Sequence, residues 1–295
     1  MALNTSITRM LGIRHPIIQG GMNYAGSARL SAAVANAGGL GLISALTQPS
    51  GAALRSEIRA ARGMIAPDGP GALGVNLSIL PTKFEEERGL YDEYISAIIE
   101  EGVGVVETSG PRPPSCVFAK LKRHGIKIIH KCVSTRAAHT AEALGADAIA
   151  LDGFECAGTP GNGDVSNWVL QALGARELSV PFVASGGIGD GRQLAAALTL
   201  GAAGVTMGTR FMATAEAPID NSIKHALVDA GVGTMIARPN TKAPDPRPHG
   251  VRLSVWSCGP VMALIDDVPT CEVLIERMVA EAVCAIEEVT ARVGR

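Results

Sequence analysis

The sequence predicts an α/β fold, a (β/α)₈ barrel followed by a proline-rich lid and a C-terminal helix. Eight short apolar runs alternate with helical patterns, and their first residues lie 21 to 34 positions apart, the spacing of βα units. Helical stretches repeatedly end in glycine shortly before the next apolar run, and glycine is the usual residue just past a helix C-terminus. A doubly wound parallel sheet is the alternative. The barrel is favoured because there are eight strands and no dinucleotide-binding fingerprint opens the chain.

The eight runs are continuously apolar, as expected for parallel strands buried on both faces. In chain order, the expected strands are Pro16–Gln19, Gly41–Ser44, Ala72–Asn76, Val103–Glu107, Lys127–Lys131, Ala148–Leu151, Phe182–Ser185 and Gly204–Met207. The glycines expected to end the intervening helices are Gly38, Gly39, Gly102, Gly125, Gly145 and Gly201.

The pattern changes after the eighth strand. Residues 231–250 contain four prolines, which remove backbone donors, so this segment is expected to be extended, either as a lid or as a surface connector. Residues 270–292 carry apolar positions at a spacing of three to four, which predicts a helix packed on the barrel exterior. We expect a single domain over residues 1–295, with the barrel over about 14–212 and the lid and C-terminal extension over about 213–295.

Composition narrows the functional classes. With 26 basic and 28 acidic residues the formal net charge is −2, which argues against a nucleic-acid or anionic-membrane surface. No apolar run approaches the ~18 residues of a membrane helix, and the N-terminus lacks the apolar segment of a signal peptide. Six scattered cysteines without a C-x-x-C pair favour a reducing compartment. We therefore expect a cytoplasmic protein, monomeric or homodimeric, that acts on a small molecule.

In a barrel of this kind, functional groups lie where the strands end. Ser185-Gly186-Gly187 follows the seventh strand and Gly208-Thr209 the eighth. Glycines there let backbone N–H groups approach an anion, which predicts a phosphate site, although simple turn chemistry explains the same glycines.

Two polar side chains at other strand ends are further candidates. An ammonium group from Lys131 inside the barrel mouth would stabilise negative charge on a ligand, whereas a solvated loop lysine is the alternative. Asn76 is placed to hydrogen-bond a polar ring edge or to form a local Asx turn. His130 and Cys132 flank Lys131 and should point away from the site.

Other site classes are not favoured. No His, Cys or Asp cluster has metal-ligand spacing, so we predict no metal site. Ser185 lacks the G-x-S-x-G elbow of a hydrolase nucleophile. Cys156 lies in a glycine-rich loop, where we expect a buried thiol in preference to a nucleophile.

Several segments together resemble the nitronate monooxygenase (2-nitropropane dioxygenase-like) flavoproteins. Within that family, residues 44–49, 129–132 and 152–158 look most like the bacterial NADH:quinone reductase subgroup. The resemblance covers nearly the whole chain and is carried by residues 18–22, 35–41, 74–77, 106–108, 184–188 and 207–211.

The resemblance implies a TIM barrel that holds FMN without a covalent bond. It implies that Met22 and Asn76 lie against the isoalloxazine ring and that Lys131 lies near its N1–C2=O edge. The residues it assigns to the rest of the cofactor site are Gly21, Asp152, Ala157, Gly158, Ser185, Gly186, Gly187, Gly208 and Thr209, the last four of them at the phosphate. Residues 255–259 also resemble the family's C-terminal segment at the active face.

Two departures from the family pattern bear on activity. Thr159 stands where nitronate monooxygenases carry a histidine that serves as catalytic base, and threonine cannot accept a proton at neutral pH. The helical segment that relatives carry between the lid and the final helix is replaced by the proline-rich stretch 239–250.

The resulting expectation is an FMN-dependent oxidoreductase that oxidises NADH or NADPH and passes the electrons to a quinone-like or other small acceptor. One alternative is a nitronate monooxygenase restricted to anionic alkyl nitronates, which need no base. An alternative of another class is an FMN-binding protein without turnover, or one with a private biosynthetic substrate.

Overall fold

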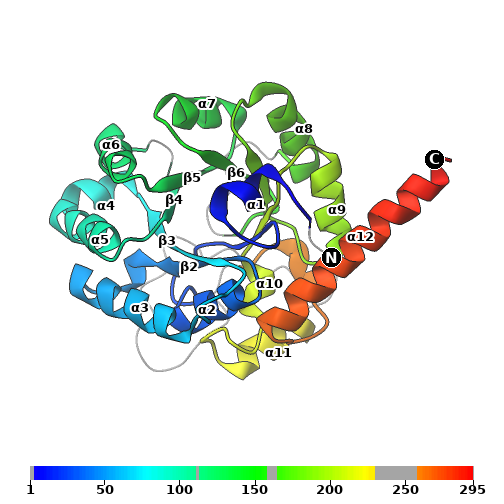
Figure 1. The fold of residues 1–295 in the computed structure, drawn as a ribbon, viewed down its shortest axis with the longest axis horizontal. Coiled ribbons are helices and arrows are strands. Elements are labelled where there is room, and N and C mark those ends of the chain that lie inside the picture. Colours follow the sequence, from blue (N-terminus) through cyan, green and yellow to red (C-terminus); the bar gives the residue numbers. More distant parts are fainter. Residues whose placement is uncertain (1–2, 111–112, 158–164, 230–257, 295) are drawn as a thin grey trace.

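The computed structural model describes residues 3–110, 113–157, 165–229 and 258–294, and its central feature is a closed barrel of eight parallel strands (Figure 1). The strands are β1 Ile17–Gln19, β2 Leu40–Ser44, β3 Ala72–Ser78, β4 Val105–Ser109, β5 Lys127–Cys132, β6 Ala148–Asp152, β7 Phe182–Ser185 and β8 Val205–Met207.

Closure of the sheet distinguishes the barrel from a doubly wound sheet. Strand β1 pairs with β2 on one side and with β8 on the other, where Ile17 lies opposite Val205 and Gln19 opposite Met207. The predicted (β/α)₈ barrel is therefore confirmed.

Helices surround the barrel and connect successive strands. The α-helices are α1 Ser6–Leu11, α2 Ala28–Asn36, α3 Gly51–Met64, α4 Pro81–Glu86, α5 Arg88–Glu100, α6 Ser115–Arg123, α7 Thr135–Ala143, α8 Asn167–Glu177, α9 Gly191–Thr199, α10 Thr209–Met212, α11 Asn221–Asp229 and α12 Cys271–Arg292. The described residues also form the 3₁₀ helices η1 Ala45–Thr47 and η3 Pro260–Leu264.

The helix-to-strand joints have the predicted geometry. Five of the glycines adopt positive φ, at 91° for Gly38, 59° for Gly102, 70° for Gly125, 94° for Gly145 and 97° for Gly201. Because side chains disfavour this region, glycine there ends each helix and turns the chain into the next strand.

The fourth strand begins and ends two residues later than predicted. The backbone N–H of Val103 donates to the carbonyl of Ile98, so Val103 takes part in the turn that caps the C-terminus of α5 and does not yet belong to the strand. At the other end, Thr108 pairs with His130 and Ser109 with Lys131 of β5. Thr108 and Ser109, whose polar side chains indicated that the strand had already ended, are therefore its last two paired residues.

Helix α1, which the sequence patterns did not predict, lies over the centre of the ring of strands in Figure 1. Its Ile7 and Leu11 join one apolar cluster with Ile18, Leu42 and Ile129 of the strands, so α1 packs on the barrel interior. Thr5 caps the helix, and the Thr5 and Thr8 side chains each accept the other's backbone N–H.

The predicted C-terminal helix is confirmed as α12, which packs against α9 and α2. Leu274, Ile275 and Met278 are buried, whereas Val289 is 57 % exposed on the last turns, which project past the barrel in Figure 1. The predicted lid, residues 239–250, lies outside the described residues. Among the described helices, none combines the length and the apolar character that crossing a membrane requires.

Candidate functional site

A cavity of about 770 Å³ opens at the carboxyl ends of the strands. Its volume is within the range of about 300–1,000 Å³ that is typical of small-molecule sites. Most of the predicted site residues line it: Gly21, Met22, Asn76, Lys131, Asp152, Ala157, Ser185, Gly186, Gly187, Gly208 and Thr209. Two others, Gly158 and Thr159, lie outside the described residues, as do His249 in the predicted lid and residues 255–257.

The loop after β7 has the backbone geometry of an anion cradle. Gly186 and Gly187 adopt φ of 92° and 76°. A side chain at Gly186 would meet the backbone nitrogen of Cys156 at 2.6 Å, so only glycine fits there. Within the described chain, the N–H groups of Gly186 and Gly187 have no hydrogen-bond partner. Successive free N–H groups in such a loop form a concavity that favours anions.

Two side-chain amides, from α8 and α9, hold this loop in place through its backbone carbonyls. The Asn167 side chain, at the start of α8, donates to the Ser185 carbonyl at 2.8 Å and also to the Gly186 carbonyl. The Gln193 side chain, on α9, donates to the Gly187 carbonyl. The carbonyl groups of the loop are thus occupied.

Gly208 completes the cradle from β8. A side chain at this position would be in ordinary contact with Met22 alone, so Gly208 is open toward the cavity. The Gly259 N–H donates to Thr209 Oγ at 3.2 Å, which brings the segment before η3 against the same loop.

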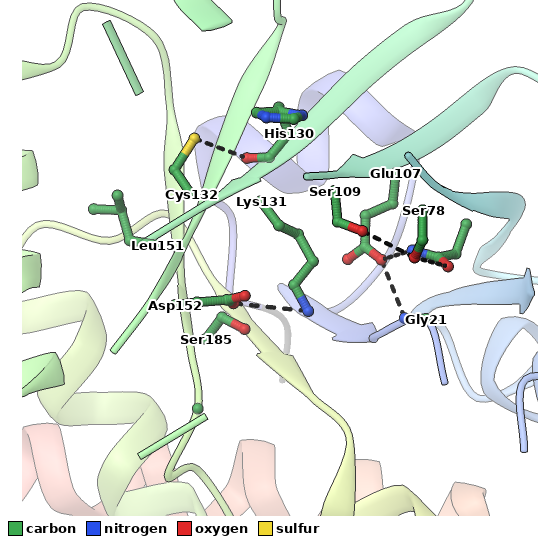
Figure 2. Close-up of polar contacts among 12 residues, drawn as sticks. Gly21, Ser78, Glu107, Ser109, His130, Lys131, Cys132, Leu151, Asp152 and Ser185 are labelled. Atoms are coloured by element: carbon green, nitrogen blue, oxygen red, sulfur yellow. Dashed lines mark hydrogen bonds and ion pairs between the residues drawn. The ribbon is translucent and has the colours of Figure 1, made fainter. Parts of the chain in front are cut away.

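Lys131 supplies the positive charge of the cavity wall. Its Nζ lies 3.7 Å from Oδ1 of Asp152, and the two side chains are only 15 % and 13 % exposed (Figure 2). Burial alone would lower the pKa of Lys131, but the carboxylates of Asp152 and Glu107 outweigh burial and raise it. Lys131 is therefore charged at neutral pH.

Glu107, which was not among the predicted site residues, lies next to this lysine and is 1 % exposed. Its Oε2 accepts the backbone N–H of Gly21 at 3.1 Å (Figure 2). The same oxygen accepts a hydrogen bond from the side-chain amide of Asn76 at 2.6 Å. Burial raises the pKa of Glu107, while Lys131 opposes this shift. A glutamate at the end of an apolar strand was the available signal, since acidic residues are seldom fully buried unless they have a role there.

The Asn76 side chain has a fixed orientation. Its amide nitrogen donates to Glu107, and its Oδ1 accepts a hydrogen bond from Ser78 Oγ at 3.2 Å. Ser109 Oγ in turn donates to Ser78 Oγ at 2.9 Å. These serines lie at the ends of β3 and β4, so the strand ends hold Asn76 in one rotamer at the cavity.

The loop after β1 is fixed to β2 through Ser44. Met22 N–H donates to Ser44 Oγ at 3.0 Å, and Ser44 Oγ donates to the Met22 carbonyl at 2.9 Å. This pair of bonds fixes the backbone that carries the Met22 side chain into the cavity.

The residues that were expected to point away from the site do so in part. His130 is buried against Phe118 of α6, and its Nδ1 hydrogen-bonds Thr108 at 2.7 Å. Cys132 is almost fully buried, although it also borders the cavity.

Burial raises the pKa of the Cys156 thiol to about 12, so this cavity residue is a neutral thiol at physiological pH. In the part of the chain that the structure describes, no group of three or more His, Cys, Asp or Glu side chains could hold a metal ion.

A sequence model of the family described as nitronate monooxygenase matches residues 4–242. The chain is 34 % identical to a (3aS,4S,5R,7aS)-5-hydroxy-7a-methyl-1-oxo-octahydro-1H-indene-4-carboxyl-CoA dehydrogenase of Mycobacterium tuberculosis. The match extends over 253 residues, which make up 85 % of this chain and 66 % of the relative. It is 35 % identical to the Rhodococcus jostii protein of the same name, over 78 % of this chain and 61 % of the relative. The chain therefore spans slightly less than two thirds of the length of these two relatives.

Three further proteins are similar over most of the chain. A nitronate monooxygenase of Pseudomonas aeruginosa is 33 % identical over 75 % of this chain and 72 % of its own length. Among solved structures, FabK from Thermotoga maritima superposes with a TM-score of 0.84 at 28 % identity, covering 98 % of this chain and 99 % of its own. A nitroalkane oxidase from Streptomyces ansochromogenes, at 23 % identity and a TM-score of 0.77 over 96 % of this chain and 99 % of its own, shares the fold.

Proposed function

This chain belongs to the nitronate monooxygenase family, and from that premise we propose that it is an FMN-dependent oxidoreductase. We propose NADH or NADPH as its electron donor and a quinone-like or other small molecule as its acceptor. The observation that carries the proposal is the combination, in one cavity, of the Gly186–Gly187 backbone cradle with the buried Lys131 ammonium.

The residues present fit the flavin nucleotide at both ends. Backbone N–H groups of Gly186, Gly187, Gly208 and Thr209 would hold the phosphate, since free N–H groups suit an anion. Met22, Asn76 and Lys131 would hold the ring, with Asp152, Ala157 and Ser185 along the cavity wall. When bound, FMN supplies a two-electron carrier that protein side chains cannot provide.

The chain's own part in the reaction is positioning and electrostatics. Lys131 is charged, and a fixed cation at the ring edge favours the negative charge that reduction adds. Asn76 has one orientation because Glu107 and Ser78 occupy both ends of its amide. Oxidation of a nicotinamide needs this geometry and no base, which suits a chain with Thr159 at the family's histidine position.

The direct test uses purified protein under anaerobic conditions. We expect yellow protein that releases FMN on denaturation and whose flavin absorbance is bleached by NADH or NADPH. Colourless protein that takes up no FMN would contradict the proposal as a whole. Bound flavin that neither nicotinamide reduces would contradict the proposed electron donor.

Two other substrates are supported by the names of relatives. The first is an anionic alkyl nitronate, because the Pseudomonas aeruginosa relative at 33 % identity is a nitronate monooxygenase. The second is a CoA thioester, because the two relatives at 34 % and 35 % identity are carboxyl-CoA dehydrogenases. Bleaching of the flavin by an alkyl nitronate or by an alicyclic acyl-CoA, but by neither nicotinamide, would select one of these instead.

A further inference from the structure

Glu107 is a carboxyl group beneath the cavity with one satisfied oxygen and one free oxygen. Its Oε2 accepts the hydrogen bonds from Gly21 and Asn76, whereas its Oε1 is buried and has no hydrogen-bond partner among the described residues. Burying a carboxylate oxygen without a hydrogen-bond partner costs desolvation free energy. Protonation of Oε1 would therefore reduce the desolvation free energy that this buried carboxylate costs the fold.

The charges around Glu107 come from the neighbouring strands. Lys131 on β5 is the cation, and Asp152 on β6 is the other carboxylate. The other groups that face this cluster are the neutral amide of Asn76 on β3, the backbone N–H of Gly21 after β1 and the neutral thiol of Cys156 near Lys131. With both carboxylates ionised the cluster has one net negative charge, and with Glu107 protonated it is neutral.

Resting on the function proposed above, we propose that Glu107 takes up one proton from solvent when the bound flavin is reduced. The C–H bond of the donor, NADH or NADPH, would break, and its two electrons and one proton would pass to the flavin together as hydride. The second proton comes from water and forms an O–H bond at Oε1 of Glu107. The charge that reduction brings into the cavity is thereby balanced within the protein, and Glu107 acts as a positioning and proton-holding residue beside Lys131.

Glu107 is a better proton acceptor than Asp152 for two reasons. Oδ1 of Asp152 is also buried without a hydrogen-bond partner among the described residues, but it lies 3.7 Å from the Lys131 ammonium, so its charge is compensated. Glu107 has no cationic nitrogen within 4.0 Å in the described chain and is almost completely buried. Burial already raises the pKa of Glu107, and an added negative charge in the cavity would raise it further.

The experiment measures the reduction potential of the FMN-loaded protein between pH 7 and pH 8. A two-electron couple loses about 30 mV per pH unit for each proton it takes up. We expect a slope of about 59 mV per pH unit for the wild type, which corresponds to two protons. We expect about 30 mV per pH unit for Glu107→Gln, whose amide oxygen can still accept the hydrogen bonds of Gly21 and Asn76. Glu272→Gln, which changes an exposed carboxyl at the start of α12 away from the cavity, is the control and should retain the wild-type slope.

A second measurement uses the wild type alone and does not depend on how the variant folds. An infrared difference spectrum of reduced minus oxidised protein should gain the C=O stretch of a protonated carboxylic acid that shifts in D₂O. A wild-type slope of about 30 mV per pH unit without this band would overturn the inference while leaving the proposed function intact. A slope near 59 mV per pH unit in Glu107→Gln would also overturn it, because another group would then hold the proton. Protein that takes up no FMN would overturn the proposed function, and this inference with it.

Discussion

The Nζ atom of Lys131, on β5, lies 3.7 Å from Oδ1 of Asp152, on the adjacent strand β6. This separation is longer than the 2.7–2.9 Å or so of a charge-assisted hydrogen bond. Asp152 thus helps to keep the lysine protonated without fully occupying its donors. A side chain at Gly20 would come within 3.9 Å of the same Nζ, so the ammonium lies close to the end of β1, where the cavity opens.

Replacing Lys131 by methionine should lower the reduction potential of the bound flavin and slow its reduction. The substitution keeps most of the side-chain volume but removes the cation that favours negative charge on the reduced ring. Loss of one such contact in a preorganised site costs on the order of 2–4 kcal/mol. The measurements are a potentiometric titration and the rate of anaerobic bleaching by NADH or NADPH.

Lys127→Met is the matched control for this prediction. Lys127 begins the same strand at the opposite end of the barrel, where its Nζ lies 3.3 Å from Asp147. The control variant should keep the wild-type potential. An unchanged potential in Lys131→Met would place Lys131 outside the flavin site.

Replacing Gly187 by aspartate should abolish FMN binding. The position has a φ of 76° and faces the cavity, so the new side chain brings both backbone strain and a negative charge to the proposed phosphate cradle. FMN affinity, measured by ultrafiltration of the reconstituted apoprotein, is the readout.

Gly125→Asp separates strain from charge in this experiment. Gly125 has a similar φ of 70°, and a side chain there would meet nothing within 4 Å. It lies at a helix-to-strand joint away from the cavity, so this variant should bind FMN as the wild type does. Equal loss of FMN in both variants would mean that Gly187 acts through folding and not through the phosphate.

Acidification should destabilise the fold through His130. Burial lowers the pKa of His130 from 6.5 to about 4, so between these values the unfolded chain binds a proton that the folded chain does not. The contribution of His130 to the free energy of unfolding is therefore complete above pH 6.5 and is lost as the pH falls to about 4. The shift corresponds to roughly 3 kcal/mol in the free energy of unfolding.

Urea unfolding at several pH values checks this prediction with two variants. His130→Gln should be less stable at neutral pH, because the bond to Thr108 and the contact with Phe118 change, but its stability should fall less between pH 6.5 and 4. His124→Gln, at an exposed position after α6, controls for the loss of a histidine. An unchanged pH dependence in His130→Gln would show that other groups cause the acid sensitivity.

Much of the barrel was predictable because its signals are local. Strands that are buried on both faces appear as continuous apolar runs, and each helix end that needs positive φ is marked by a glycine such as Gly38 or Gly145. Closure of the barrel is different. It depends on β1 pairing with β8, between residues such as Ile17 and Val205 that are far apart in the sequence. The count of eight strands and the lack of a dinucleotide-binding fingerprint indicated it only indirectly.

The features that sequence reasoning missed depend on tertiary contacts. Helix α1 is only six residues long, and its Ile7 and Leu11 find apolar partners only once the barrel exists. The significance of Glu107 lies in its hydrogen bonds with Gly21 and Asn76 and in the nearby charge of Lys131, and these three residues come from other strands. The loop glycines and Lys131 were found because a strand end is itself a positional signal in a barrel.

The last prediction concerns Thr159, which lies in the segment outside the described residues and is argued from sequence alone. A neutral nitroalkane must lose its α-proton before it can be oxidised, and a positioned base typically accelerates such a step by about 10²–10⁴-fold. Threonine cannot serve as that base, whereas hydride transfer from a nicotinamide does not need one. We therefore expect NADH or NADPH, but not neutral nitroethane, to bleach the flavin of the wild type. Thr159→His should raise activity on nitroethane more than activity on NAD(P)H, and Thr159→Val, which also lacks a base, should not. Rapid turnover of neutral nitroethane by the wild type, with no response to either nicotinamide, would reverse the order of the two proposed activities and make His249 the next candidate base.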